Sequence, residues 1–252
     1  MVNIPVITYH AIGDFDSPLW IKPSLFESHL QAIVKNNYQT ISLATLFSLL
    51  NKNHPLPSKT IVLTFDDGYE SFYTEAWPKL QKYGLTATVF LITDFCGKNN
   101  RWQGHPKFVP QEKLLNWKQI QQLASEGCNF GAHTKSHIPL STIPLDTVRQ
   151  EIKQSKEIIE TKINSPVTTF AYPYGDTNQQ VTRLIQEYFD GAVGTKLGFV
   201  KQGDNPFLLD RIDSFYLNPF IINNLQTFTI KNYFFCRHLL RSFRRQFQSD
   251  WH

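Results

Sequence analysis

The chain has 252 residues, of which 41% are hydrophobic, so it can bury a large core; one α/β barrel typically needs about 250 residues. Its net charge of only +4 excludes the strongly basic field of a nucleic-acid-binding domain. The three cysteines, Cys96, Cys128 and Cys236, are odd in number and far apart, so neither a disulfide framework nor a cysteine-based metal site is predicted.

Segments typical of strands alternate with segments typical of helices. Strands are predicted at residues 6–10, 38–41, 61–65, 88–92, 129–132, 168–171, 191–194 and 208–209. Helices are predicted at 24–34, 43–50, 74–83, 116–127, 145–162 and 177–188, with Ser24, Asn116 and Thr177 as N-cap residues and Glu27 completing a capping box with Ser24. Such alternation argues for a parallel sheet that closes into a barrel. We predict one barrel domain over residues 1–225 and a basic amphipathic tail over residues 226–252.

Two adjacent carboxylates, Asp66 and Asp67, follow the predicted strand that ends at Phe65. They therefore lie at a carboxyl end of the sheet, where parallel α/β folds place their chemistry. Farther along, His133 and His137 are four residues apart. One carboxylate with two imidazoles is a three-ligand set that leaves a position open for water, as in catalytic metal sites. The other carboxylate is then free to take a proton from that water.

Each of these segments also has a simpler interpretation. Asp-Asp-Gly after a strand is a common solvated turn, and two histidines four residues apart also occur on an exposed helix face. A third segment leads a strand into a turn at Pro173, with Tyr172 and Tyr174 at its mouth. By itself this segment is a weak signal.

In this order and spacing, the three segments resemble the motifs of the polysaccharide deacetylase family, the carbohydrate esterases related to nodulation-type chitooligosaccharide deacetylases. TFDDG at 64–68 matches the first motif, HTKSH at 133–137 the second and PYG at 173–175 the core of the third. The resemblance extends over residues 7–212. It implies a distorted (β/α) barrel of roughly seven parallel strands. It also implies metal-dependent removal of acetyl groups from amino sugars or other acetylated glycans.

Carried over position by position, the resemblance makes Asp66 the general base and Asp67, His133 and His137 the ligands of a divalent metal. Zn²⁺ is the first expectation for this mixed ligand set, with Co²⁺ and Ni²⁺ as alternatives. The metal would lower the pKa of bound water toward ~7 and polarise the acetyl carbonyl.

The resemblance also implies a substrate side of the site. Pro173 and Tyr174 would lie on this side, and a backbone N–H near Tyr174 would help to hold the oxyanion. Thr134 or Ser136 could hold a ligand imidazole through a hydrogen bond. Trp102 lies in a long loop at 94–113, where an exposed indole could stack on a sugar face or instead anchor the loop to the core.

One departure from the family pattern concerns an arginine. Many members carry Arg two residues before the Pro of the third motif, where this chain has Ala171. A subgroup with Phe-Ala-Tyr-Pro-Tyr-Gly at this motif uses an Arg from a later strand, and Arg211 is the candidate. It would pair with Asp66 and keep it ionised. The alternative is a surface pair of Arg211 with Asp210 or Asp213.

A second departure is the absence of the Leu-x-x-His that supplies the general acid in many members. His10, at the end of the first predicted strand, is the expected replacement, because imidazole has an ordinary pKa near ~6.5. The alternative is a histidine that only caps the strand. The sequence gives no such context to four further histidines, which we expect to be ordinary surface or core residues: His29, His54, His105 and His238.

The tail combines apolar and basic residues at helical spacing over 234–247. It is expected to pack on the barrel, with weak contact to an anionic membrane surface as the alternative. The chain begins with a predicted strand rather than a secretory leader, and no run of about 20 apolar residues could span a bilayer. We therefore expect a cytoplasmic protein.

These observations predict a metal-dependent hydrolase that removes N- or O-linked acetyl groups from a carbohydrate, with an N-acetyl amino sugar polymer or glycoconjugate as the first expectation. The alternative is a catalytically weak carbohydrate-binding or scaffold protein that retains the metal site. A metal phosphoesterase is disfavoured because no Gly-rich phosphate cradle accompanies the motifs. The partner is thus an acetylated carbohydrate, and the sequence does not identify the sugar.

Overall fold

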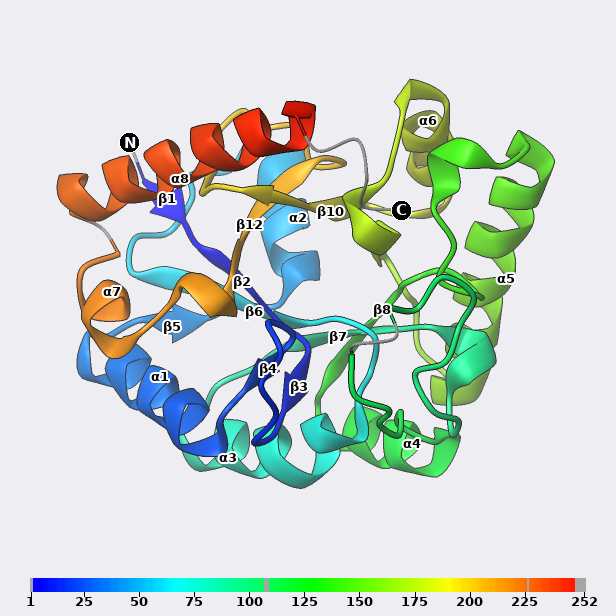
Figure 1. Cartoon of the computed structure of the whole chain (residues 1–252), viewed down its shortest axis with the longest axis horizontal. Coiled ribbons are helices and arrows are strands. Elements are labelled where there is room, and N and C mark those ends of the chain that lie inside the picture. The colour runs from blue at the N-terminus through cyan, green and yellow to red at the C-terminus, as the bar shows by residue number, and fades with distance from the viewer. Residues whose placement is uncertain (1, 107–108, 226, 248–252) are drawn as a thin grey trace.

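The computed structural model describes residues 2–106, 109–225 and 227–247. Seven parallel strands close into a barrel, because the first of them, β2, pairs with both β12 and β6 (Figure 1). Around the barrel the order is β2 (Val6–Tyr9), β12 (Leu209–Asp213), β10 (Gly191–Leu197), β9 (Thr169–Ala171), β8 (Asn129–Ala132), β7 (Thr88–Leu91) and β6 (Thr60–Phe65). The predicted distorted (β/α) barrel is confirmed.

Helices surround the barrel on its outside, except α2, which lies within the ring of the others (Figure 1). They are α1 (Pro23–Lys35), α2 (Leu43–Asn51), α3 (Trp77–Lys82), α4 (Trp117–Ser125), α5 (Leu145–Ile163), α6 (Gln179–Tyr188), α7 (Pro219–Asn223) and α8 (Phe228–Phe247). A single π-helical turn, Phe72–Ala76, precedes α3. The short strand β5 (Gln39–Thr40) pairs in parallel with the start of β6 and extends the same sheet. Four other short strands form two separate pairs, β1 (Asn3–Ile4) with β11 (Val200–Lys201) and β3 (Ala11–Ile12) with β4 (Trp20–Ile21).

The helix starts show where local sequence was sufficient. The predicted cap at Asn116 is confirmed, and its side chain forms a full capping box with Gln119. The predicted cap at Ser24 is wrong: α1 begins at Pro23, because the fixed φ of proline suits the first helical position. The cap of α6 is Asn178 rather than Thr177, since the Asn178 side chain accepts the Val181 N–H.

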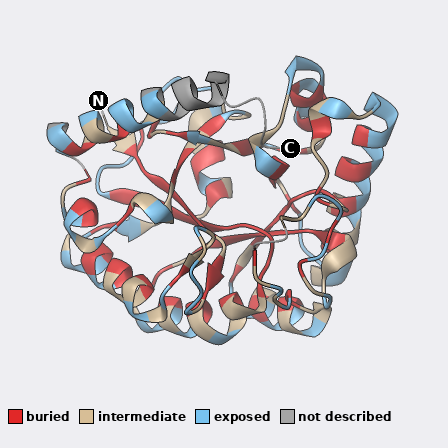
Figure 2. Cartoon of the chain, viewed as in Figure 1, coloured by how far each residue is buried: buried red, intermediate tan, exposed pale blue. Residues whose placement is uncertain are grey.

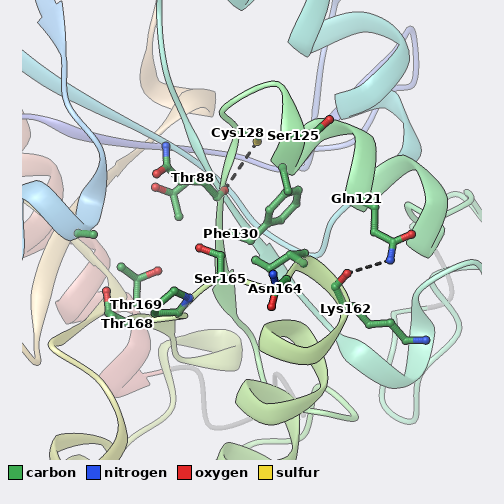
Figure 3. A pocket seen from close by; sticks show the side chains of 15 residues that line it. Thr88, Gln121, Ser125, Cys128, Phe130, Lys162, Asn164, Ser165, Thr168 and Thr169 are labelled. Carbon is green, nitrogen blue, oxygen red and sulfur yellow. Dashed lines mark hydrogen bonds between the residues drawn. The ribbon is translucent and has the colours of Figure 1, made fainter.

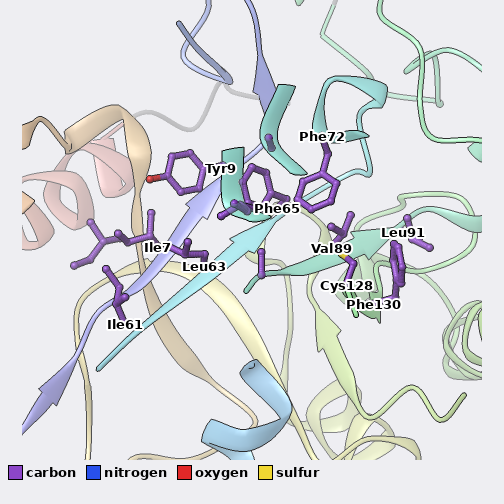
Figure 4. Close-up of a cluster of buried hydrophobic side chains, with 14 of the residues drawn as sticks. Ile7, Tyr9, Ile61, Leu63, Phe65, Phe72, Val89, Leu91, Cys128 and Phe130 are labelled. Carbon is purple, nitrogen blue, oxygen red and sulfur yellow. The ribbon is translucent and has the colours of Figure 1, made fainter. Parts of the chain in front are cut away.

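The two faces of each strand bury different side chains. The residues of β2 and β6 that face the helices are apolar, and Tyr9 stacks on Phe65 with ring centroids 5.0 Å apart (Figure 4). Alternate residues such as Val6 and Val62 point into the barrel. Phe47 of α2 joins that inner cluster, so α2 closes the amino end of the barrel. Figure 2 shows the strands buried nearly throughout, while the helices expose their outer faces.

Helix α8 packs against β10 through its buried face, which includes Ile230 and Phe234, while Phe235 and Leu240 are exposed. The side chains at 228, 239 and 241–247, and residues 226 and 248–252, lie outside the described part of the chain, so the side chains of the second half of the predicted basic tail are not described. The division into a barrel and a tail at residue 226, and weak membrane contact by the tail, stay predictions. Within the described residues, no helix has the length and apolar character needed to cross a membrane.

Candidate active site

A cavity of about 390 Å³ opens at the carboxyl ends of the barrel strands. It collects side chains from segments far apart in the sequence, and the predicted site residues that line it are His10, Asp66, Asp67, Trp102, His133, His137, Tyr174 and Arg211. Pro173 is buried and is not part of this lining, so only Tyr174 of the predicted pair reaches the cavity. The two histidines of the second motif follow β8 in a loop and are buried, which excludes the alternative of an exposed helix face.

The carboxylate of Asp67 converges with the imidazoles of His133 and His137. Asp67 Oδ1 lies 3.5 Å from His133 Nε2 and 3.4 Å from His137 Nε2, and the three ligand atoms lie within 4.8 Å of one another. A tetrahedral zinc site with bonds of about 2.0–2.1 Å would separate neighbouring ligand atoms by about 3.4 Å. Oδ1 is also buried and lacks a hydrogen-bond partner among the described residues. The donor atoms therefore fit a divalent cation better than a hydrogen-bonded cluster.

The imidazole of His133 is fixed by a backbone carbonyl rather than by a hydroxyl. Its Nδ1 lies 2.7 Å from the Ala171 carbonyl oxygen, which can only accept, so Nδ1 donates to it and Nε2 is the ring nitrogen that faces Asp67. The prediction that Thr134 or Ser136 holds an imidazole is wrong. Thr134 Oγ1 instead accepts the backbone N–H of His137, and Ser136 donates to Glu151.

The ring of His137 is held between two aromatic side chains. Its centroid lies 4.4 Å from that of Trp102 and 4.6 Å from that of Tyr174, and Trp102 Nε1 donates to the Tyr174 hydroxyl at 3.1 Å. Trp102 is 6% exposed, so of the two alternatives the structure favours the indole that anchors the loop. The loop folds back and packs this indole edge-on against Phe95 and His105, so it anchors the loop while forming part of the cavity wall.

Asp66 forms a two-pronged ion pair with Arg211, with both N···O distances 2.7 Å. Arg211 Nε donates to the Gly194 carbonyl at 2.8 Å, so the guanidinium is fixed in the barrel. The alternative surface pair is not formed, since Asp210 faces Lys196 instead. Burial raises the pKa of Asp66, but the charge and hydrogen bonds of Arg211 outweigh it and hold the pKa below its ordinary value. Asp66 is therefore an ionised carboxylate.

Two further histidines line the cavity. His10 Nε2 lies 4.0 Å from Asp66 Oδ2, within reach of a group bound between them. His105 was not singled out from the sequence, yet it lies in the wall beside Trp102, with ring centroids 4.8 Å apart. The only sequence signal for His105 is its position in the same long loop as Trp102.

Left-handed backbone is concentrated at this site. Asp67, Thr134, His137 and Tyr174 have φ of 69°, 63°, 59° and 59°. Among the residues that the structure describes, the other four non-glycine residues with positive φ are Asn37, Asn53, Lys59 and Asn164, of which three are asparagines that tolerate this region. Bulky residues held there cost of order 1–3 kcal/mol each and persist where the surroundings over-determine them, as at active sites.

A second cavity, of about 380 Å³, lies at the opposite end of the barrel (Figure 3). It is lined by the first residues of three strands, Thr88, Asn129 and Thr169, and by neutral side chains of α4 and the loop before β9. Gln121 on its rim donates to the Lys162 carbonyl at 2.9 Å.

A (β/α) barrel with a buried Asp-His-His group beside an arginine-paired aspartate is compatible with a hydrolase that uses a divalent metal. The model of the polysaccharide deacetylase family matches residues 53–188, just over half of the chain. The chain therefore belongs to the polysaccharide deacetylase family, and the predicted family is confirmed. Its class of activity is hydrolytic deacetylation of carbohydrates.

Individual relatives agree with this assignment. YxkH of Bacillus subtilis (strain 168) is 27% identical over 211 residues, which cover 83% of this chain and 71% of YxkH. The poly-β-1,6-N-acetyl-D-glucosamine N-deacetylase of Escherichia coli (strain K12) is 25% identical over 68% of this chain, and the match spans only 30% of that protein. The Streptococcus pyogenes deacetylase PplD, solved in complex with acetate, has a TM-score of 0.77 and 28% identity, covering 90% of this chain and 98% of PplD.

Proposed function

We propose that the protein removes N-linked acetyl groups from an amino-sugar polymer or glycoconjugate with the help of one divalent metal ion. The observation that carries the proposal is the convergence of Asp67, His133 and His137 beside an ionised Asp66 in an open cavity. The name of the Escherichia coli relative supports an N-acetylglucosamine polymer as the first substrate to test. O-acetylated glycans are the alternative substrate class.

Asp67, His133 and His137 would hold the ion, for which Zn²⁺ is the first choice and Co²⁺ or Ni²⁺ are alternatives. A divalent ion bound there supplies Lewis acidity, which lowers the pKa of water toward ~7 and polarises the acetyl carbonyl. The three ligands leave space on the cavity side for water and substrate.

The remaining chemistry belongs to protein side chains. Asp66, kept ionised by Arg211, takes a proton from the attacking water as its oxygen bonds to the acetyl carbon. The backbone N–H of Tyr174 stabilises the charge that develops on the acetyl oxygen. His10 donates a proton to the sugar nitrogen as the carbon–nitrogen bond breaks, so the products are acetate and a free amine.

The alternative of a binding protein with weak catalysis was motivated by Ala171 and by the missing carboxyl-terminal histidine. Arg211 reaches Asp66 from β12, and His10 lies beside the same carboxylate. Both groups thus occupy places from which the family chemistry can operate, and this supports the enzyme over the binding protein.

The test combines metal content with acetate release. Elemental mass spectrometry of the native protein and of a His133→Ala, His137→Ala double variant should find about one ion per chain in the native protein alone. Acetate release is then measured with β-1,6-linked N-acetylglucosamine oligomers and compared with release from chitin oligomers and from O-acetylated xylan. A native protein that binds no Zn²⁺, Co²⁺ or Ni²⁺ would overturn the mechanism. Metal binding without acetate release from any of these glycans would favour the binding protein.

A further inference from the structure

We propose that Glu151, which lies outside the cavity, is a positioning residue that shapes the loop carrying His133 and His137 and thereby sets the affinity of the site for its metal. This inference rests on the metal site proposed above. It concerns a residue that none of the three family motifs contains.

The loop between the two histidines needs external support. Thr134 and His137 both have left-handed backbone, with φ of 63° and 59°, so the loop would relax if nothing held it. Its first residue is tied to the barrel, because the His133 N–H donates to the Leu91 carbonyl at 3.0 Å. The middle of the loop is held by two sets of contacts, one from Glu151 and one from the segment that follows β7.

Glu151 of α5 supplies that support through one buried carboxylate. Its Oε2 accepts the backbone N–H groups of Lys135 and Ser136, each at 2.9 Å, and its Oε1 accepts the Ser136 hydroxyl at 2.8 Å. Glu151 is 8% exposed and shares the buried face of α5 with apolar residues such as Val148 and Ile152. A carboxylate so placed is costly unless it is hydrogen-bonded, and here the loop satisfies it.

The opposite side of the loop is held by the chain that follows β7. The Asp94 N–H donates to the Lys135 carbonyl at 2.9 Å. The peptide groups at Lys135 are thus hydrogen-bonded on both sides, by Glu151 and by Asp94. These hydrogen bonds fix the positions of the His133 and His137 imidazoles, whose Nε2 atoms lie 3.5 and 3.4 Å from Asp67 Oδ1. A small displacement of the loop would break that spacing before it disturbed the barrel.

The same helix offers a matched control. Glu160 of α5 accepts the Val167 N–H at 2.9 Å and the Lys156 ammonium at 2.8 Å. Val167 lies in the segment that leads into β9 at the amino end of the barrel. It makes the same kind of contact from the same helix, but to a segment that carries no ligand. Its removal should cost stability without affecting the metal.

The experiment measures Zn²⁺ affinity by calorimetry, and the visible spectrum of the Co²⁺ form, for Glu151→Ala, Glu151→Gln and Glu160→Ala. Glu151→Ala should weaken metal binding by about 10- to 100-fold and alter the Co²⁺ spectrum. Glu151→Gln should recover most of the affinity, since its amide oxygen can accept both backbone N–H groups and its NH₂ can donate to Ser136. Glu160→Ala should leave affinity and spectrum unchanged, even with a lower Tm.

A folded Glu151→Ala protein that binds Zn²⁺ like the native protein would overturn the proposal, as would an equal loss of affinity in Glu160→Ala. Should Glu151→Ala fail to fold, Ser136→Ala still tests the contact, and an unchanged affinity there would count against the proposal. In the native protein the backbone amides of Lys135 and Ser136 should exchange their hydrogens slowly. Fast exchange would show that Glu151 does not hold the loop and would overturn the proposal. Absence of metal from the native protein would overturn the proposed function as well, whereas an unaffected Glu151 variant overturns this inference alone.

Discussion

The two ends of the barrel hold cavities of nearly equal volume, about 390 and 380 Å³, but opposite chemistry. At the carboxyl end, Asp66, Asp67, His133 and Arg211 are all at most 4% exposed. At the amino end the wall is made largely of neutral hydroxyl, amide and apolar side chains. Burial of charge costs several kcal/mol per ion unless it is compensated. Clusters of buried charges are therefore found mainly at catalytic or binding sites. Cavity size therefore does not identify the site, whereas buried ionisable groups do.

The largest expected effect is on catalysis at the charged end. Asp66→Asn should lower the rate of acetate release by about 10²- to 10⁴-fold, because the amide cannot take the water proton. Metal content should stay at the native level, since the ligand set does not include Asp66. Asp210→Asn, on the same strand as Arg211 but paired with Lys196, is the matched control and should remain active. Loss of metal in Asp66→Asn would instead make Asp66 a ligand.

The next effect concerns the stability of the buried pair. Arg211→Met leaves Asp66 buried without its partner and should lower the free energy of unfolding by about 3–5 kcal/mol. The double variant Arg211→Met, Asp66→Asn removes both charges and should regain much of that loss. Urea denaturation measures all three proteins. Equal stability of the single and double variants would show that the uncompensated charge is not the cause.

How much of this could be predicted from sequence depends on the range of the determining contacts. The barrel and the residues of the charged cavity followed from short motifs at strand ends, where each side chain is placed by its own strand. The cap at Asn116 was predictable because its partner is Gln119, three residues away. In each of these cases the signal is local.

The contacts that were missed are all set by the path of distant segments. Burial of Trp102 depends on how the loop 94–113 folds back over His137, and no periodicity encodes that path. In the sequence, Glu151 is one of many charged residues on a polar helix. Its role becomes visible only in the structure, where α5 lies beside the loop at Lys135, 16 residues away. The carbonyl of Ala171 that holds His133 carries no side-chain signal at all.

One buried imidazole lies outside both cavities. It shows the free-energy cost of burying an ionisable group away from the candidate active site. His29 on α1 is fully buried, with Nδ1 3.2 Å from the Tyr9 hydroxyl, and burial lowers its pKa from 6.5 to about 4. Because the folded pKa is depressed, the unfolded chain takes up this proton first as the pH falls. The neutral imidazole therefore contributes stability above pH 6.5 that is lost toward pH 4, by about 3 kcal/mol.

His29→Leu removes this titration. The difference in free energy of unfolding between the native protein and the variant should shift by about 3 kcal/mol between pH 7.5 and pH 4, with the native protein losing more on acidification. Urea denaturation at a series of pH values measures the difference. A difference that is constant across this range would show that His29 does not titrate with a depressed pKa.

The smallest effect gives the sharpest contrast, since one substitution can be made at both ends of the barrel. Thr169, at the amino end, has a buried hydroxyl without a hydrogen-bond partner among the described residues. Thr64, below the charged cavity, donates to the Ile7 carbonyl at 2.8 Å, and its oxygen lies 3.2 Å from an Arg211 nitrogen. Valine has nearly the shape of threonine without the hydroxyl, so each change isolates one polar atom.

Thr169→Val should raise the free energy of unfolding by about 1 kcal/mol, because a buried polar atom without a partner is lost. Thr64→Val should lower it by about 1–2 kcal/mol, because a carbonyl, a guanidinium and the buried Thr8 hydroxyl each lose a partner. Urea denaturation with unchanged m-values measures both. If the substitutions at Thr64 and Thr169 changed the free energy of unfolding in the same direction, the hydrogen bonds of the charged end would not distinguish it from the neutral end. Only its charges would then do so.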